Sequence, residues 1–199
     1  MIEVVKSATF DRWLRNLKDR HAKARIQVRI DRLALGNPGD VEPVGAGVSE
    51  LRIHVGPGYR VSFITESTRI IVLLRGGDKS TQRADIDRAH RLAGRMVNPM
   101  TPATENFSRY DTADYLDDTD QAAAYLAAAI EQAHEDPALI PVALGAIARS
   151  GNLSELARRV GMSREGLYKA FAEDGNPSFA TVMKVAATLG LRISLEPAA

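Results

Sequence analysis

Residues 105–136 read ENFSRYDTADYLDDTDQAAAYLAAAIEQAHED and separate two halves of opposite charge. This acidic segment carries nine carboxylates and one basic residue, Arg109. Residues 1–96 hold 18 Lys and Arg against 11 Asp and Glu, a formal charge of +7, whereas residues 97–199 hold 8 against 14, a charge of −6. Such asymmetry is typical of one half that faces nucleic acid and another that faces a partner. We therefore expect attraction within the chain, with the acidic segment covering a basic surface.

The composition excludes several classes of protein. The chain has no cysteine, so it contains neither a disulfide nor a metal site built on sulfur, and we expect no metal and no other cofactor. The beginning of the chain, MIEVVKSATF, does not resemble a signal or transit peptide. No apolar run approaches the length of a membrane span. We expect a cytoplasmic protein that makes no contact with a membrane.

The first half, residues 1–96, alternates strand and helix patterns. Its expected elements are a strand at 2–5, a helix capped by Ser7 and running to 18, a helix at 20–35, strands at 48–55, 59–66 and 69–74, and a helix at 78–94. Gly76-Gly77 is expected to end the last strand. This order predicts an α+β domain in which an antiparallel sheet is combined with a helical hairpin.

Strand alternation places basic side chains together. Arg52, His54, Arg60 and Arg75 are predicted to share one face of the sheet, with Lys79 just past its end. A solvated polar face is the ordinary interpretation of such a pattern. However, four cations and an imidazole without nearby carboxylates repel one another unless an anion binds there. The pattern therefore also indicates an anion site.

Two motifs in this half resemble a known family. GPGYRVSF (residues 56–63) and LLRGGDKSTQRADIDRA (residues 73–89) resemble the RelE/HigB-type toxins of bacterial toxin–antitoxin modules, in the addiction module killer branch. The resemblance implies a RelE/ParE-like fold over residues 1–96. It also implies a metal-independent endoribonuclease that cuts mRNA, commonly on the ribosome, by in-line attack of the 2′-hydroxyl.

The resemblance assigns roles to the basic residues. Arg60 would bind the scissile phosphate in a bidentate manner, and Arg52 would bind the flanking phosphate. Lys79 would neutralise the developing charge or assist proton transfer. His54 is either an acid/base group or a structural hydrogen-bonding residue. Arg75 is a weaker candidate because its strand is expected to be buried on both faces.

One position departs from the family pattern. Ser62 stands where these toxins often carry an aromatic residue that can stack on a base. The related ParE toxins share the fold but act on DNA gyrase. A degenerate enzyme therefore remains an alternative to an active RNase.

Residues 97–104, VNPMTPAT, are predicted to be a linker because they contain two prolines and no periodicity. Residues 105–136 after it would neutralise the toxin, with a helix from Thr119 to about Glu135. One hypothesis is a clamp on the cationic sheet; the alternative is a solvated helix face. The candidate neutralising residues are Phe107, Tyr110, Asp111, Asp114, Tyr115 and Asp118.

Residues 137–199 are predicted to form an all-α helix-turn-helix domain. Helices at 155–160 and 164–172 flank the turn Gly161-Met162-Ser163, and a further helix follows at 178–189. The second helix would enter the major groove of DNA by its N-terminal end. The candidate DNA-contacting residues are Ser163, Arg164, Glu165, Tyr168 and Lys169. The alternative is a helical unit with no role in DNA binding.

The end of the chain carries a second resemblance. Residues 167–197, LYKAFAEDGNPSFATVMKVAATLGLRISLEP, resemble the HigA-type antidotes, which are Xre-like repressors of their own promoter. In these families toxin and antidote are usually separate chains. A terminal strand at 191–195 would pair with its copy in a homodimer. We therefore expect a fused toxin–antitoxin protein that binds mRNA or the ribosome and operator DNA; the alternative is a DNA-binding regulator with a catalytically dead toxin-like scaffold.

Overall fold

The computed structural model describes residues 2–66, 69–97, 105–151, 153–172 and 175–192. The chain forms two compact units, Met1–Asp111 and Thr112–Ala199. In the described residues, all strands belong to the first unit. No helix in these residues combines the length and the apolar character needed to cross a membrane. The predicted linker lies largely outside the described residues, as does most of the predicted terminal strand at 191–195.

The first unit is an α+β fold, as predicted. Its elements are β1 (Glu3–Ser7), α1 (Ala8–Asn16), α2 (Arg20–Ala34), β2 (Val41–Gly45), β3 (Val48–Ile53), β4 (Tyr59–Thr65), β5 (Ile70–Asp78), α3 (Gln82–Val97) and β6 (Phe107–Arg109). They build one six-stranded sheet in the order β2-β3-β4-β5-β1-β6. The prediction of a purely antiparallel sheet was wrong, because β1 pairs with β5 in parallel. The long connection that a parallel pair requires is supplied by α1, α2 and the strands that follow them.

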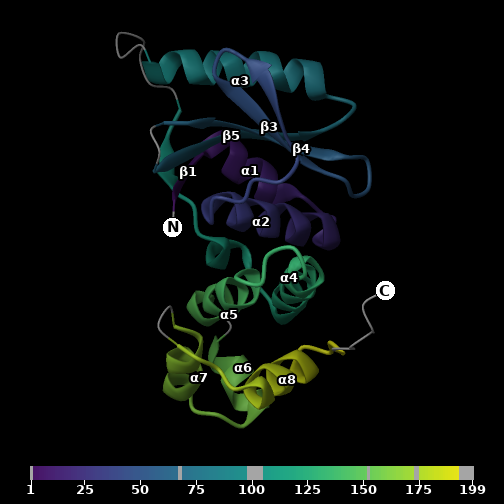
Figure 1. Ribbon diagram of the computed structural model, residues 1–199, viewed down its shortest axis with the longest axis vertical. Coiled ribbons are helices and arrows are strands. Elements are labelled where there is room, and N and C mark those ends of the chain that lie inside the picture. The colour runs from purple at the N-terminus through teal and green to yellow at the C-terminus, as the bar shows by residue number, and fades with distance from the viewer. Residues whose placement is uncertain (1, 67–68, 98–104, 152, 173–174, 193–199) are drawn as a thin grey trace. The chain divides into compact units, whose positions relative to one another are not determined.

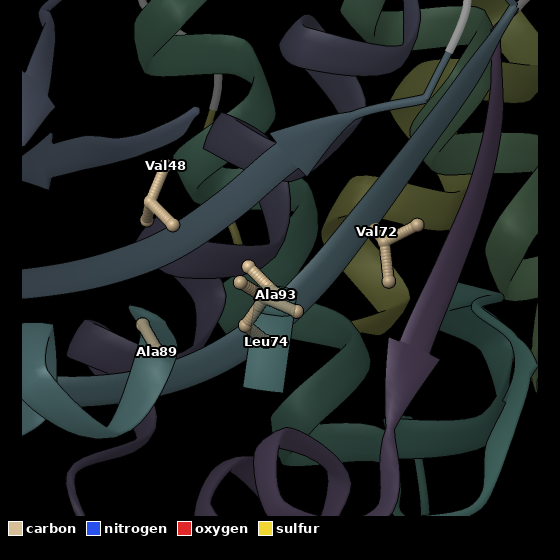
Figure 2. Packing of buried hydrophobic residues seen from close by; sticks show 5 residues of the cluster. All are labelled: Val48, Val72, Leu74, Ala89 and Ala93. Atoms are coloured by element: carbon tan, nitrogen blue, oxygen red, sulfur yellow. The ribbon is translucent and has the colours of Figure 1, made fainter. Parts of the chain in front are cut away.

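The sheet of the first unit lies between two helical layers (Figure 1). Helix α3 covers one face, and α1 and α2 lie against the other. Figure 2 shows the apolar cluster under α3, in which Val48, Val72 and Leu74 of the sheet lie close to Ala89 and Ala93 of the helix. Small alanines on α3 let the helix approach the sheet closely.

Ser7 joins β1, α1 and β5. Its hydroxyl accepts a hydrogen bond from the Phe10 backbone N–H over 3.0 Å, so it caps α1 as predicted. The same hydroxyl donates to the Leu74 carbonyl over 2.6 Å. One buried side chain therefore fixes the point where the chain leaves the sheet and begins α1.

Strand β5 continues through Gly76 and Gly77 to Asp78, so the predicted break at these glycines was wrong. A Cβ atom on Gly76 would overlap the indole ring of Trp13, and one on Gly77 would overlap the Asp85 carboxylate. The glycines are therefore used for close approach of α1 and α3 to the strand rather than for a turn.

The second unit is helical in its described residues. Its elements are a short 3₁₀ helix η1 (Thr112–Tyr115), α4 (Thr119–Gln132), α5 (Leu139–Arg149), α6 (Leu153–Val160), α7 (Arg164–Phe171) and α8 (Phe179–Thr188). Asp118, Ser163 and Ser178 each accept a backbone hydrogen bond at the start of α4, α7 and α8. Gly161, between α6 and α7, has φ +73°, a conformation that favours glycine at a helix end.

Candidate functional site

Three predicted arginines lie on neighbouring strands of one sheet face. Arg52 of β3 is directly opposite Arg60 of β4, and Arg75 of β5 is opposite Ser62. The register of β4 and β5 shifts between Ser62 and Phe63, which leaves Leu74 as an extra residue on β5. Such a bulge re-aims the side chains around it. As a result Leu74 and Arg75 both reach α3, where Arg75 binds a carboxylate.

Each of these arginines has an acidic neighbour. Arg52 Nη2 lies 2.7 Å from Glu42 Oε2 on β2, and Arg60 Nε lies 3.7 Å from Glu50 Oε2 on β3. Arg75 pairs with Asp85 on α3. The expectation that the cations lack nearby carboxylates was therefore wrong. Two of these acids, Glu42 and Asp85, lie on β2 and α3, and the strand pattern did not predict how these elements pack.

Glu50 and Asp85 are the buried acids of this network. Glu50 is 1% exposed and accepts a hydrogen bond from Gln82 Nε2 over 2.8 Å. Its burial raises the pKa of Glu50, against the opposing effects of Gln82 and Arg60. Asp85 accepts from Arg75 Nε and from the Thr81 hydroxyl, each over 2.5 Å. Neither acid can reach a substrate, so both act by holding the basic side chains in place.

His54 directly follows β3 and is exposed. Its Nε2 atom lies 2.5 Å from Oδ2 of Asp40. The hydrogen bond to His54 lowers the pKa of Asp40 below its ordinary value, with Arg52 adding a smaller effect. An imidazole oriented by a carboxylate and open to solvent suits an acid/base group, and it equally suits a surface ion pair.

Lys79 is exposed in the turn after β5, and its Cβ atom lies near Gly58 of the β3–β4 turn. Within residues covered by the structure, no ion pair involves Lys79. Because Arg60 is opposite Gly77 and Tyr59 is opposite Asp78, Lys79 lies at the same end of the sheet as the arginines. We call the group of predicted residues at this end the cationic rim: it comprises Arg52, His54, Arg60, Arg75 and Lys79.

A pocket of about 430 Å³ lies beside the rim, and sequence reasoning missed it. It is lined by Thr9, Arg12, Trp13, Asn16, Leu17 and Arg75. The Trp13 ring also lies 6.4 Å from the Tyr59 ring, centroid to centroid. The available signal was an arginine, Arg12, next to the chain's single tryptophan in the predicted first helix. A pocket lined by an aromatic residue and two arginines has side chains of the kind that bind a nucleotide.

The neutralising candidates in the first unit lie at an edge of its sheet, not across the cationic rim. Phe107 to Arg109 form β6, which pairs with β1. Tyr110 is buried and its ring makes an edge-on contact with Phe10, whereas Phe107 is exposed. Phe107 therefore makes an edge contact through its strand, and a clamp on the sheet face stays a prediction for the carboxylates. Asp111, the last candidate of this unit, is half-buried.

The remaining neutralising candidates belong to the second unit. Asp118 caps α4 by accepting from the Gln121 backbone N–H over 2.7 Å. Asp114 lies exposed in η1, and Tyr115 at the end of η1 is buried. One of the three thus has a local structural role, as the N-cap of α4.

Helix α7 and its N-cap residue carry the predicted DNA-contacting residues. Leu167 and Phe171 of α7 are buried, and Ser163 accepts from the Gly166 backbone N–H over 3.0 Å. The opposite side of α7 is open: the predicted residues Ser163, Arg164, Glu165, Tyr168 and Lys169 are all exposed. Their contact with DNA remains a prediction.

Comparison with known proteins assigns a family to each half. Residues 106–197 match the family described as "Probable addiction module antidote protein", and residues 12–95 match "Phage derived protein Gp49-like", a toxin-type family. The chain is a toxin–antitoxin protein. It is similar to two Haemophilus influenzae proteins, at 49% identity over 92 residues and 43% over 93. These matches cover 93% and 94% of the relatives but only 46% and 47% of this chain. No solved structure gave a significant match.

The family boundaries and the packing of this toxin–antitoxin protein do not coincide. The antidote match begins at residue 106, whereas the first compact unit extends to Asp111. Strand β6 and Tyr110 therefore belong to the antidote by sequence and to the toxin-like sheet by packing.

Proposed function

We propose that the first unit is a RelE/HigB-type endoribonuclease that cuts mRNA, in the usual case on the ribosome, and that the antidote half holds it silent. The antidote half also binds operator DNA through α7 as a homodimer and represses its own promoter. The observation that carries this proposal is the presence of a toxin-type family and an antidote family in consecutive parts of one chain. The cationic rim supplies the groups that such a reaction requires.

The proposed chemistry uses the RNA's own 2′-hydroxyl as nucleophile. His54, oriented by Asp40, accepts the proton of the 2′-hydroxyl, whose oxygen forms a bond to phosphorus. The bond to the 5′-oxygen breaks, and this leaving group takes up a proton from solvent or from Lys79. Arg60 and Arg52 bind the phosphate oxygens, and Lys79 stabilises the charge that develops on them. The products are a 2′,3′-cyclic phosphate and a 5′-hydroxyl.

Lys79 gives the cleanest test of this proposal, because it is exposed and its removal leaves no buried carboxylate without a partner. Residues 1–97 and the full chain are expressed separately, and growth and RNA integrity are measured. We expect fragment 1–97 to cleave RNA, and Lys79→Ala to reduce cleavage on the order of 10²–10³-fold. Arg91→Ala removes another exposed cation, on α3, and is expected to leave cleavage unchanged. A fragment that harms neither growth nor RNA would contradict the proposal.

A second candidate is a DNA-binding regulator whose toxin-like half has lost its activity. Two observations favour it: the rim arginines have acidic partners, and Ser62 is 2% exposed where the toxin pattern places an aromatic side chain. In that case fragment 1–97 would be inert with or without Lys79, while the full chain would still bind DNA from its own upstream region.

A further inference from the structure

Strand β6 extends the toxin-like sheet with residues of the antidote family. In the register, Ser7 is opposite Phe107, Lys6 opposite Ser108 and Val5 opposite Arg109. The Ala8 N–H donates to the Asn106 carbonyl, and the Tyr110 N–H donates to the Val4 carbonyl, each over 2.8 Å. The five strands before β6 all precede residue 97, so without β6 the edge of β1 would be unpaired.

Side chains secure both ends of this strand. Before β6, the Glu105 carboxylate accepts hydrogen bonds from the Thr9 backbone N–H over 2.7 Å and from its hydroxyl over 3.0 Å. After β6, the Tyr110 ring lies 6.3 Å from the Phe10 ring and 5.9 Å from the Lys6 ammonium group, centroid to atom. A strand held at both ends by specific contacts is a docking contact rather than a chance extension of the sheet.

We propose that residues 105–110 are the docking strand of the antidote, which binds the β1 edge of the toxin-like sheet by strand addition. The H. influenzae relatives are each matched over nearly their whole length by less than half of this chain, so parts of this size occur as separate polypeptides. In this fused chain the contact is made within one polypeptide. The contact holds the two families together independently of the peptide bonds between residues 97 and 105.

The docking strand also places a carboxylate next to a residue that lines the pocket beside the cationic rim. Thr9, which Glu105 binds, is one of the residues that line the pocket with Arg12, Trp13 and Arg75. This consequence rests on the proposed function, because it matters only if the pocket receives RNA. The docking itself does not depend on it.

The ladder provides a matched pair of substitutions. Along an antiparallel pair, every second residue directs its backbone N–H and C=O groups toward the neighbouring strand. On β6 the backbone groups of Asn106 and Tyr110 are bonded to β1. Ser108 therefore directs its N–H toward β1, whereas Arg109 directs its N–H away from β1. Proline removes a ladder hydrogen bond at the first position and is tolerated at the second. Both side chains are exposed, so the two substitutions differ chiefly in this bond.

The experiment uses the full chain with a specific protease site introduced between residues 98 and 104, folded intact and then cut. Association of the two fragments is measured by light scattering across a dilution series, with no RNA or DNA present. We expect the parent and Arg109→Pro to remain associated to the same dilution, and Ser108→Pro to dissociate at about ten- to a hundredfold higher concentration. Equal behaviour of the two proline variants, or immediate separation of the parent, would overturn the proposal.

A second pair decides the question if Ser108→Pro fails to fold. Tyr110→Ala removes the buried ring, and Phe107→Ala removes an exposed ring from the same strand. We expect the first to weaken association at least tenfold and the second to change it less than threefold. Equal effects would count against docking. Because the measurement is binding alone, an inactive toxin half would leave its outcome unchanged.

Discussion

Replacing Arg75 by alanine tests whether the rim arginines are held by structural ion pairs. Asp85 is 4% exposed, and Arg75 provides one of its two direct hydrogen-bond donors; Thr81 provides the other. Removing one partner of a buried pair commonly costs about 3–5 kcal/mol. The side chain of Arg75 is 23% exposed and the Thr81 donor remains, so we expect the lower figure of about 2 kcal/mol.

Trp13 makes this cost measurable in the first unit alone. It is the only tryptophan of the chain and packs over Gly76, the neighbour of Arg75. Urea unfolding followed by its fluorescence therefore reports the free energy of unfolding of this unit, even if the second unit unfolds separately.

Asp85→Asn completes a double-mutant cycle. The neutral amide removes the buried charge, so Arg75→Ala should cost about 1–2 kcal/mol less in the Asn background than in the parent. Arg88→Ala is the matched control, because Arg88 lies 3.7 Å from the same carboxylate but is largely exposed, and its loss should cost less than about 0.5 kcal/mol. If Arg75→Ala leaves the unfolding curve unchanged, Arg75 is not needed by Asp85 and the structural interpretation is refuted.

Three further predictions, two of them with a matched control, have defined outcomes. Gly76→Ala should destabilise the first unit by roughly 1–3 kcal/mol and shift the tryptophan emission, because the new methyl group overlaps the indole ring. Gly94→Ala is the control: this glycine lies in open space on a helix, so the substitution should stabilise the unit by about 0.5–1 kcal/mol. The pKa of Glu50 is raised by folding, so ionisation of Glu50 lowers the free energy of unfolding as the pH rises above 4.5. Gln does not ionise, so the free energy of unfolding of Glu50→Gln, measured by urea titration, should rise relative to that of the parent between pH 4 and pH 7. Arg164→Ala should weaken binding to the duplex upstream of the chain's own gene about ten- to a hundredfold by fluorescence anisotropy, and Lys184→Ala on α8 should not.

Local signals predicted most helices and part of the sheet. Ser7 caps a helix where the sequence placed it, because a cap depends only on the next three residues. Strand β2 was missed because its sequence, VEPVG, contains proline and ends in glycine, as edge strands often do. The parallel pairing of β1 with β5 joins residues far apart in the chain and leaves no local signal.

The sequence predicted the basic residues of the candidate site but not their acidic partners. Alternation correctly placed Arg52 and Arg60 together. It also places Glu50 on the same face, two residues before Arg52, so this buried partner was open to prediction from the sequence. Asp85 was not, because it reaches Arg75 through the packing of α3 and through a bulge that turns Arg75 toward that helix. Strand period alone cannot reveal a bulge.

The docking strand also changes how the charge asymmetry of the chain is understood. In its described first part, the antidote attaches through backbone pairing and a buried tyrosine rather than by laying carboxylates over the rim. Such a contact is insensitive to salt, unlike attraction between exposed charges. It is also short, at three residues against the usual five or six, so the contacts of Glu105 and Tyr110 at its two ends contribute much of the binding. A covalent join between binding partners adds an effective concentration in the millimolar range to this contact. In a fused chain, therefore, exposure of the β1 edge is governed by local opening of β6 and not by turnover of a separate antidote.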